Sequence, residues 1–253
     1  MKIIRSLDNQ SIKKFRSLSV RKYREQFGLC LIEGEKVIKE ALREDLVEHL
    51  IIDETRSQEF DALIQENDSN VILVTSEILN SLSSATTCQG IVAVVRIQKS
   101  KPIDVNKNLL VLDHLQDPGN LGTIIRSGVA SGHLEIILVE SVDPYNDKTL
   151  RSTSGTIFYP NFTKMKQDEF IEFAKSNKLN ILLADMDGQN IFESKNDFSS
   201  PYALVIGSEG QGVSNNIREL PHKKIAIPMN KEVESLNAGV SASVIMFNLA
   251  NRK

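Results

Sequence analysis

The amino-acid sequence predicts an α/β fold with a parallel sheet in the carboxy-terminal half of the chain. Strand-like runs rich in Val, Ile and Leu recur along the sequence, separated by segments long enough to form helices. In the carboxy-terminal half, three of these runs lead into a turn or a helix start that carries polar or glycine residues. Open parallel sheets bind their ligands at such strand ends.

Residues 1–97 are predicted to form a small amino-terminal α/β domain. Short apolar runs indicate strands, and longer segments with one apolar face indicate helices. In chain order we expect strand Leu29–Ile32, helix Glu35–Arg43, strand Val47–Ile52, helix Ser57–Gln65, and strands Val71–Val74 and Gly90–Ile97.

Residues 98–108 are polar, contain Pro102 and show no sustained period, which is typical of a linker. Residues 109–253 then form the carboxy-terminal domain, with a parallel sheet covered by helices on both faces. Its expected strands are Leu109–Leu112, Glu135–Val139, Ile181–Ala184, Tyr202–Ile206 and Lys224–Ile227.

The last predicted helix begins near Leu236 and is apolar nearly all round. Such a helix is buried, either inside its own domain or against a second subunit. Homodimerisation is therefore a hypothesis that the sequence supports.

Composition places the chain among folded globular proteins, with 41% apolar and 25% charged residues out of 253. No apolar run approaches the roughly 18 residues of a spanning helix, and the amino terminus lacks a signal-peptide core, so we expect a cytoplasmic protein without membrane segments. The net charge of −3 is uneven, because residues 1–24 carry eight basic residues and one acid, a net +7.

The first of the three segments runs from Asp117 to Arg126 and includes Asn120-Leu121-Gly122. Its glycines permit a tight strand-to-helix turn, and Asn120 is expected to cap the helix. Arg126 should then face roughly the same way as Leu121 or Gly122, where it could grip a phosphate or orient a hydroxyl. A capped helix with a solvent-facing arginine is the structural alternative.

The second segment is a buried-type strand followed by the loop Gly207-Ser208-Glu209-Gly210-Gln211-Gly212. Its glycines let the backbone approach a ligand closely, although a plain tight turn explains them equally well. In the third segment, Ile227-Pro228-Met229 ends a strand, and Ser235-Leu236-Asn237 stands at the start of the final helix. Small polar residues there are most often caps.

Together the three segments resemble, in order, the three motifs of the SpoU/TrmH family of RNA ribose 2′-O-methyltransferases, part of the SPOUT superfamily. The resemblance implies a deep trefoil knot in the parallel sheet, S-adenosylmethionine as cofactor, and a dimer partner that completes the site. It implies catalytic roles for the polar motif residues Arg126, Asn120, Glu209, Ser235 and Asn237. It implies cofactor binding by Gly207, Gly212, Ile227, Met229 and Leu236.

The role of Arg126 within this resemblance has two interpretations. The family's motif-one arginine is commonly described as a general base, yet a guanidinium stays protonated at ordinary pH. We therefore favour an electrostatic clamp that holds the ribose or a phosphate and stabilises the developing alkoxide.

RNA is the expected partner. Basic residues near the amino terminus, with Phe15 and Tyr23 interleaved, fit contact by charge and stacking, and a segment that resembles a family motif adds two more. The candidate RNA-binding residues are Lys13, Lys14, Arg16, Arg21, Lys22, Arg24, Lys148 and Arg151. Solvated helix faces would show similar charge.

Ribosomal RNA is favoured over transfer RNA, because residues 1–97 resemble the substrate-binding domain of ribosomal RNA enzymes in the family. Three alternatives remain open at this point. They are a transfer RNA methyltransferase, a non-catalytic RNA-binding protein of the same fold, and a nucleotide-dependent oxidoreductase. The absence of the Gly-x-Gly-x-x-Gly fingerprint counts against the last of these.

Two departures from the family pattern stand in the third segment. Lys231 occupies a position where the family usually has glycine, and Ala238-Gly239 replaces the commoner Val-Ser. A metal site at Asp113-His114 is not expected, because adjacent strand residues point to opposite faces and no other histidine lies close in sequence.

Overall fold

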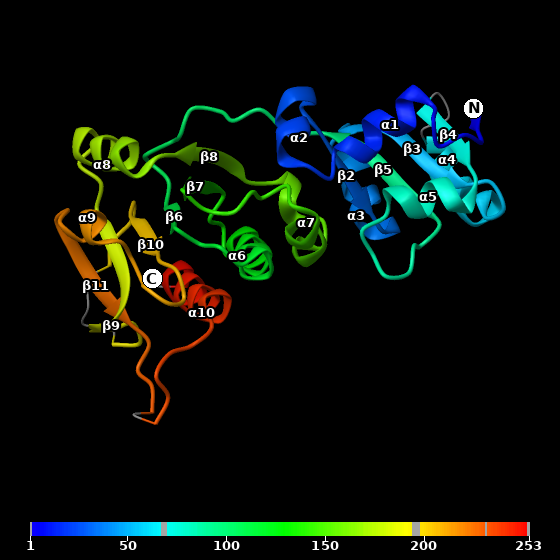
Figure 1. The fold of residues 1–253 in the computed structure, drawn as a ribbon. Coiled ribbons are helices and arrows are strands. Elements are labelled where there is room, and N and C mark those ends of the chain that lie inside the picture. Colours follow the sequence, from blue (N-terminus) through cyan, green and yellow to red (C-terminus); the bar gives the residue numbers. More distant parts are fainter. Residues whose placement is uncertain (1, 67–69, 194–197, 231, 252–253) are drawn as a thin grey trace. The chain divides into compact units, whose positions relative to one another are not determined.

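The computed structural model describes residues 2–66, 70–193, 198–230 and 232–251. The chain divides into two compact units (Figure 1). The first consists of Met1–Lys99 and Tyr145–Phe158, and the second of Ser100–Pro144 and Tyr159–Lys253. The sequence placed residues 145–158 in the carboxy-terminal domain, whereas in the structure they pack with the first unit.

The first unit is built on a mixed sheet of five strands in the order β1-β4-β3-β5-β2. Strand β4 pairs in parallel with β1 and β3, and β5 pairs antiparallel with β3 and β2. The strands are β1 Lys2–Ile4, β2 Leu29–Glu33, β3 Val47–Asp53, β4 Val71–Val74 and β5 Ile91–Arg96. The four strands predicted in this region are confirmed, while β1, with three residues, is too short to show a period.

Helices pack against this sheet, and the predicted helix Glu35–Arg43 is found with the same bounds. The predicted helix Ser57–Gln65 divides into a 3₁₀ turn and a short α-helix. The helical elements are α1 Gln10–Ser17, α2 Arg21–Phe27, α3 Glu35–Arg43, η1 Ser57–Phe60, α4 Asp61–Glu66, α5 Ser76–Leu82, α7 Asp147–Thr153 and η3 Thr156–Phe158.

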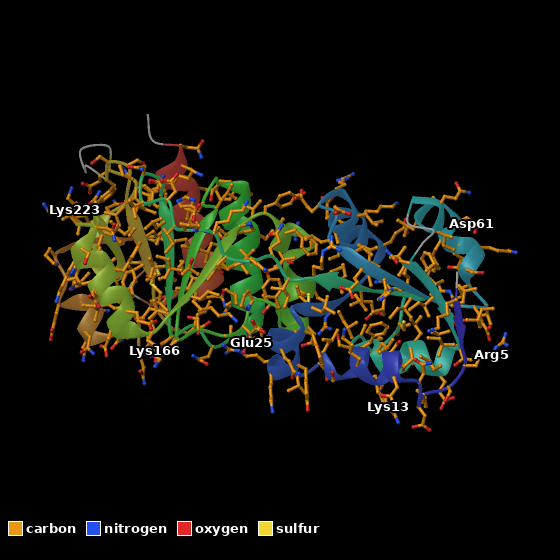
Figure 2. The ribbon with its side chains drawn as sticks, turned by 90° about the horizontal axis from the view of Figure 1, so that it is seen from above. Arg5, Lys13, Glu25, Asp61, Lys166 and Lys223 are labelled. Carbon is orange, nitrogen blue, oxygen red and sulfur yellow. The ribbon has the colours of Figure 1, made fainter. Side chains whose placement is uncertain are left out.

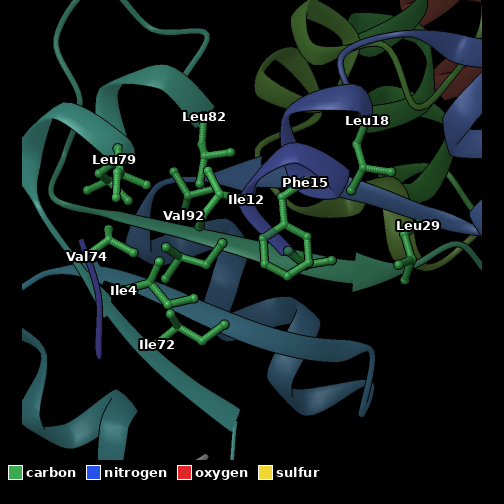
Figure 3. Packing of buried hydrophobic residues seen from close by; sticks show 13 residues of the cluster. Ile4, Ile12, Phe15, Leu18, Leu29, Ile72, Val74, Leu79, Leu82 and Val92 are labelled. Carbon is green, nitrogen blue, oxygen red and sulfur yellow. The ribbon is translucent and has the colours of Figure 1, made fainter. Parts of the chain in front are cut away.

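The core of the first unit lies between its sheet and helices α1 and α5 (Figure 3). Ile12 and Phe15 of α1 pack with Leu79 of α5 against Ile72 and Val92 of the sheet. Phe15 is only 3% exposed, so it contributes to this core. The expectation that Phe15 lies among the basic residues at the surface is therefore wrong.

The second unit contains a six-stranded sheet in the order β11-β9-β10-β6-β7-β8, and every pair in it is parallel. The predicted α/β fold with a parallel carboxy-terminal sheet is confirmed. The strands are β6 Leu109–Asp113, β7 Glu135–Val139, β8 Asn161–Met165, β9 Ile181–Asn190, β10 Ala203–Ile206 and β11 His222–Ala226. The sequence predicted all of these except β8.

Helices cover both faces of this sheet, as predicted. On one face, Val111 of β6 shares a core with Phe170 of α8 and Ile217 of α9. On the other face, Gly128 of α6 lies against Leu110 of β6 and Met246 of α10, and Figure 1 shows α10 running beside α6. The helices are α6 Pro118–Ala130, α8 Gln167–Ser176, α9 Asn215–Arg218 and α10 Ala238–Ala250.

A buried polar pair joins the turn after α6 to the start of β10. His133 is 1% exposed, and its Nε2 lies 2.8 Å from the Tyr202 hydroxyl. On its other side, Nδ1 lies 2.9 Å from Ser131 Oγ. Burial lowers the pKa of His133 to about 4 and raises the pKa of Tyr202. His133 is therefore neutral in the folded protein at physiological pH.

Part of the predicted linker is fixed to the edge strand β8. Ser100 Oγ donates to the Phe162 carbonyl at 2.5 Å, and the Lys101 amide donates to Asn161 Oδ1 at 2.9 Å. Residues 100–101 therefore belong to the second unit.

Candidate active site

The three segments identified in the sequence lie at one edge of the second unit's sheet. Strands β6, β10 and β11 belong to one parallel sheet, so their carboxyl ends point the same way. After β6 the chain enters α6, after β10 it forms the loop 207–212, and after β11 it runs through residues 227–237 to α10. The sheet thus brings Asn120 at the start of α6 close to Glu209 and Asn237, which follow it by 89 and 117 residues in the sequence.

Helix α6 is capped by Asp117, not by Asn120 as the sequence predicted. The helix begins at Pro118, and Asp117 Oδ1 accepts a hydrogen bond from the Asn120 amide at 2.8 Å. Asn120 is therefore the third residue of the helix, and its side chain is not used for the cap.

The Asn120 side chain instead bridges all three motifs. Its Nδ2 donates to Glu209 Oε1 in the loop after β10, and its Oδ1 accepts from Asn237 Nδ2 at 2.9 Å. Asn237 is itself the cap of α10, since its Oδ1 accepts from the Val240 amide at 3.2 Å. The expected position of Asn237 at the start of the last helix is confirmed, and three predicted site residues form one hydrogen-bonded chain.

The glycine-rich loop folds back on itself. The amide of Ser208 donates to the Gly212 carbonyl at 3.1 Å, and the Gly212 amide donates to the Ser208 carbonyl at 2.9 Å. Gly212 has a φ of 67°, which glycine adopts without strain. A Cβ on Gly207 would lie 2.1 Å from the Gly212 carbonyl carbon, so no side chain fits there while the loop keeps this shape.

A cleft of about 350 Å³ opens beside this loop. Seven of the ten residues predicted to serve catalysis or cofactor binding line it. They are Gly207, Glu209, Gly212, Ile227, Met229, Ser235 and Leu236. The cleft falls in the size range of small-molecule sites, and its wall combines apolar side chains with the loop backbone.

Charged side chains that sequence reasoning missed also line this cleft. Arg218 of α9 donates from Nε to the Val213 carbonyl at 2.8 Å and forms an ion pair with Asp185 of β9. Burial alone would raise the pKa of Asp185, but the hydrogen bond and charge of Arg218 hold it at about 2. Asp185 directly follows the predicted strand Ile181–Ala184, and this position at a strand end could have identified it as a candidate site residue. Nothing in the sequence indicates that Arg218 lines the cleft.

Acidic groups predominate in the cleft. Within the part of the chain that the structure describes, its charged lining consists of Asp185, Glu209 and Glu234 against Arg218. Lys231, the departure from the family pattern, lies outside the described residues. A cationic ligand group would find complementary charge at this wall.

A buried carboxylate fixes the far end of the loop to the sheet. Asp113, fully buried at the end of β6, accepts from the Ser214 amide at 2.7 Å. Its other oxygen lies 2.7 Å from His114 Nδ1. The expectation that Asp113 and His114 point to opposite faces is wrong, because the strand ends at Asp113 and His114 has a φ of 53°.

Arg126 lies on the exposed side of α6 and is not among the described residues that line the cleft. Arg126 follows Gly122 by one helical turn and so lies on the same side of α6, although Leu121 and Gly122 are buried and Arg126 is exposed. It shares the exposed face with Thr123, one turn earlier. Thr123 packs near Gly239 at the start of α10, where a Cβ would lie 3.1 Å from Thr123 Cγ2. The glycine of the Ala238-Gly239 departure therefore fits a close helix contact.

Most of the predicted RNA-binding residues are exposed on helices of the first unit. Lys13, which Figure 2 labels on α1, forms an ion pair with Asp8 at 2.8 Å. On α7, Arg151 contacts Ser84 and lies 3.4 Å from Asp147. The exposed residues of this set are Lys13, Lys14, Arg16, Arg21, Lys22, Lys148 and Arg151.

Arg24 differs from the rest of this set, because it is only 5% exposed. Its Nη1 donates to the carbonyls of Leu18 and Ser19, both at 2.9 Å. These bonds hold the turn between α1 and α2, which favours a structural role for Arg24 over contact with RNA.

The fold and the cleft define an α/β protein with a cleft of small-ligand size at the carboxyl edge of a parallel sheet. A family model described as the SpoU rRNA Methylase family matches residues 107–247, and one described as an MRM3-like substrate binding domain matches residues 9–93. The chain belongs to the SpoU rRNA methylase family, and the predicted membership is confirmed.

Characterised relatives match over nearly the full chain. The 23S rRNA (guanosine(2553)-2′-O)-methyltransferase RlmP of Bacillus subtilis is 30% identical, with 98% of this chain and 99% of the relative covered. The AdoMet-bound rRNA methyltransferase from Sinorhizobium meliloti has a TM-score of 0.84 at 26% identity, covering 99% and 97% of the two chains. The SpoU methyltransferase AviRb from Streptomyces viridochromogenes, in complex with AdoMet, has a TM-score of 0.83 at 25% identity, covering 96% and 97%.

Proposed function

We propose that this chain transfers the methyl group of S-adenosylmethionine to a ribose 2′-hydroxyl of ribosomal RNA. The observation that carries the proposal is the bridge through Asn120, which joins Glu209 and Asn237 beside the glycine-lined cleft. The relatives support it, because RlmP is a 23S rRNA 2′-O-methyltransferase, the Sinorhizobium meliloti protein is an rRNA methyltransferase, and the latter and AviRb bind AdoMet.

The residues of the cleft fit this cofactor. Bound S-adenosylmethionine supplies an activated methyl group on a cationic sulfur. Ile227, Met229 and Leu236 provide apolar surface for the adenosyl moiety, and the backbone of Gly207 and Gly212 permits close approach. The acidic residues of the lining complement the positive charge of the sulfonium and amino groups.

The catalytic task of the chain is mainly positioning, since the donor already carries a good leaving group. Arg126 acts as an electrostatic clamp on the ribose or a neighbouring phosphate and stabilises the alkoxide as it develops. The Asn120 bridge holds Glu209 in place, and Ser235 contributes its hydroxyl at the cleft. The proton leaves late, to water or another acceptor.

RNA binding and methyl transfer belong to different domains in this proposal. Residues 1–97 bind the RNA substrate, residues 98–108 link the domains, and residues 109–253 form the methyltransferase domain, with a trefoil knot in its carboxy-terminal part. Matches to a substrate-binding model and to a methylase model in these two regions support this division.

A homodimer in the cytoplasm completes the proposal. Helix α10 buries one face in the second unit, yet Val240 and Phe247 are 48% and 44% exposed. A second subunit would cover this apolar surface. In the described part of the chain, no helix is long and apolar enough to cross a bilayer. A stable monomer in sedimentation at micromolar concentration would rule out the dimer.

The decisive experiment combines calorimetry with methyl transfer. The full chain should bind S-adenosylmethionine and transfer a labelled methyl group to ribosomal RNA isolated from a strain that lacks this gene. Mapping of 2′-O-methyl groups in that strain should reveal the missing nucleotide, with 23S rRNA as the first substrate to test because RlmP acts there. A methyl group missing from transfer RNA instead would establish the alternative substrate, and RNA binding without cofactor binding would establish a non-catalytic protein.

A further inference from the structure

Two aromatic side chains form an exposed pair on the outer surface of α2. Tyr23 and Phe27 are one helical turn apart, and each is 37% exposed. Their rings are stacked, with centroids 6.3 Å apart and planes inclined by 15°. Exposure of apolar surface to water is unfavourable, and adjoining exposed apolar side chains often mark an interaction site, so this pair is a candidate interaction surface.

Lysine ammonium groups flank both rings. Lys14 reaches across from α1 and places Nζ 4.9 Å from the centroid of Phe27, while Lys22 Nζ lies 5.9 Å from the centroid of Tyr23. The nearest acidic group on α2, Glu25, is paired with Arg21 at 2.9 Å. The surface formed by Lys14, Lys22, Tyr23 and Phe27, which we name the α2 platform, is therefore both aromatic and basic.

We propose that the α2 platform binds an unpaired nucleobase of the RNA substrate, with the lysines contacting the adjacent phosphates. Aromatic rings stack on bases of any sequence, and neighbouring cations bind the backbone. Bases inside a duplex are stacked on each other and do not offer this face, whereas bases in loops and bulges do. The substrate region that reaches this surface is thus a loop or a bulge.

This inference rests on the proposed function, because it takes the RNA substrate as given and names the part of it that the first unit holds. It assigns the platform a role in substrate positioning, outside the candidate active site of the second unit. The sequence did not indicate that Phe27 belongs to this surface or that Lys14 contacts its ring. A count of charges identifies lysines but does not show which aromatic rings they contact.

The test uses the full chain and two RNA probes, a hairpin with 2-aminopurine in its unpaired loop and a blunt duplex of equal length. Phe27→Leu and Tyr23→Leu retain apolar volume but lose the π-face. Each is expected to weaken hairpin binding about tenfold, to leave duplex binding within twofold, and to abolish the quenching of 2-aminopurine. The dependence of affinity on salt should stay unchanged, because no charge is removed.

Matched variants separate stacking from charge and from folding. Tyr23→Phe keeps the ring and should bind the hairpin like the unmodified protein. Lys14→Gln should weaken both probes and reduce the salt slope by about 1. Circular dichroism and calorimetry with S-adenosylmethionine should give the same result for every variant, which verifies that the chain is folded.

The inference is overturned if the leucine variants bind the hairpin as the unmodified protein does, or if they weaken both probes equally. Cofactor binding distinguishes this failure from failure of the proposed function. An unmodified chain that binds cofactor and hairpin while the platform variants behave normally refutes the platform alone. An unmodified chain that binds neither refutes both.

Discussion

Replacement of Gly207 by alanine should displace the loop that lines the candidate cofactor cleft, because the new methyl group has no space within the loop. A Cβ at this position would lie 2.1 Å from the Gly212 carbonyl carbon, 2.3 Å from its oxygen and 2.3 Å from the Val213 nitrogen. All three are backbone atoms, so no side-chain rotation relieves the overlap. The loop has to move by more than an ångström to restore ordinary carbon contacts of about 3.5–4.0 Å.

The cost of this movement follows from the two hydrogen bonds that close the loop. Ser208 and Gly212 exchange amide and carbonyl bonds of 3.1 and 2.9 Å, and displacement of one strand of the loop breaks both. At about 1 kcal/mol for each bond, the native loop becomes less stable by about 2 kcal/mol. If the cofactor binds only the native loop, its dissociation constant rises about thirtyfold.

Calorimetric titration of the full chain with S-adenosylmethionine measures this change, and Gly210→Ala provides the matched control. Gly210 belongs to the same loop, yet a Cβ there meets no atom within 4 Å. The control should retain affinity within threefold, and both variants should retain the same far-ultraviolet circular dichroism. If Gly207→Ala bound the cofactor as tightly as Gly210→Ala, the loop would not form the cofactor wall in the conformation described here.

Three further predictions concern side chains of the second unit. Arg126→Lys keeps the charge but loses the planar fork, so methyl transfer should slow about tenfold or more at unchanged cofactor affinity; near-full turnover in rate measurements would contradict the clamp. Folding lowers the pKa of His133 from 6.5 to about 4, so the unfolded chain binds a proton more readily than the folded protein between these pH values. The free energy of unfolding should therefore keep its full value above pH 6.5 and decrease by about 3 kcal/mol as the pH drops to 4, as measured by urea unfolding. His133→Gln should flatten this dependence, and a flat profile for the unmodified protein would disprove the assignment. Asp113→Ala removes the acceptor of the Ser214 amide and should destabilise the fold by about 1–3 kcal/mol in the same assay, while Asp113→Asn, which keeps an acceptor, should cost less; equal losses would contradict this role.

The strands that the sequence predicted well are those buried on both faces. Val71–Val74 and Glu135–Val139 are found with the expected bounds, because continuous apolar runs mark central strands. The edge strand β8, with the sequence Asn-Phe-Thr-Lys-Met, was not predicted, since only part of it is buried. Strand β9 extends to Asn190 beyond its apolar run, where pairing with β11 holds polar residues in the sheet.

The sequence predicted which segments form the candidate site, but not which of their side chains form hydrogen bonds with one another. The three motifs follow strands, and parallel topology alone places strand ends at one edge. Which side chains then meet depends on packing, because Asn120 lies 89 residues from Glu209 and 117 from Asn237. Arg24 illustrates the same limit, since its charge resembles that of its exposed neighbours although the turn between α1 and α2 buries it.

The chemistry at Asn120 explains why these three segments require an amide side chain at their meeting point. One partner, Glu209, accepts a hydrogen bond, and the other, Asn237, donates one. A carboxylate at position 120 could not donate to Glu209, and an apolar residue could do neither, whereas an amide carries a donor and an acceptor on one rigid plane. The amide is available only because Asp117 already caps α6 and satisfies the Asn120 backbone. Two residues at the start of α6 thus have separate tasks: Asp117 caps the amino end of the helix, and Asn120 joins the loop after β10 to the cap of α10.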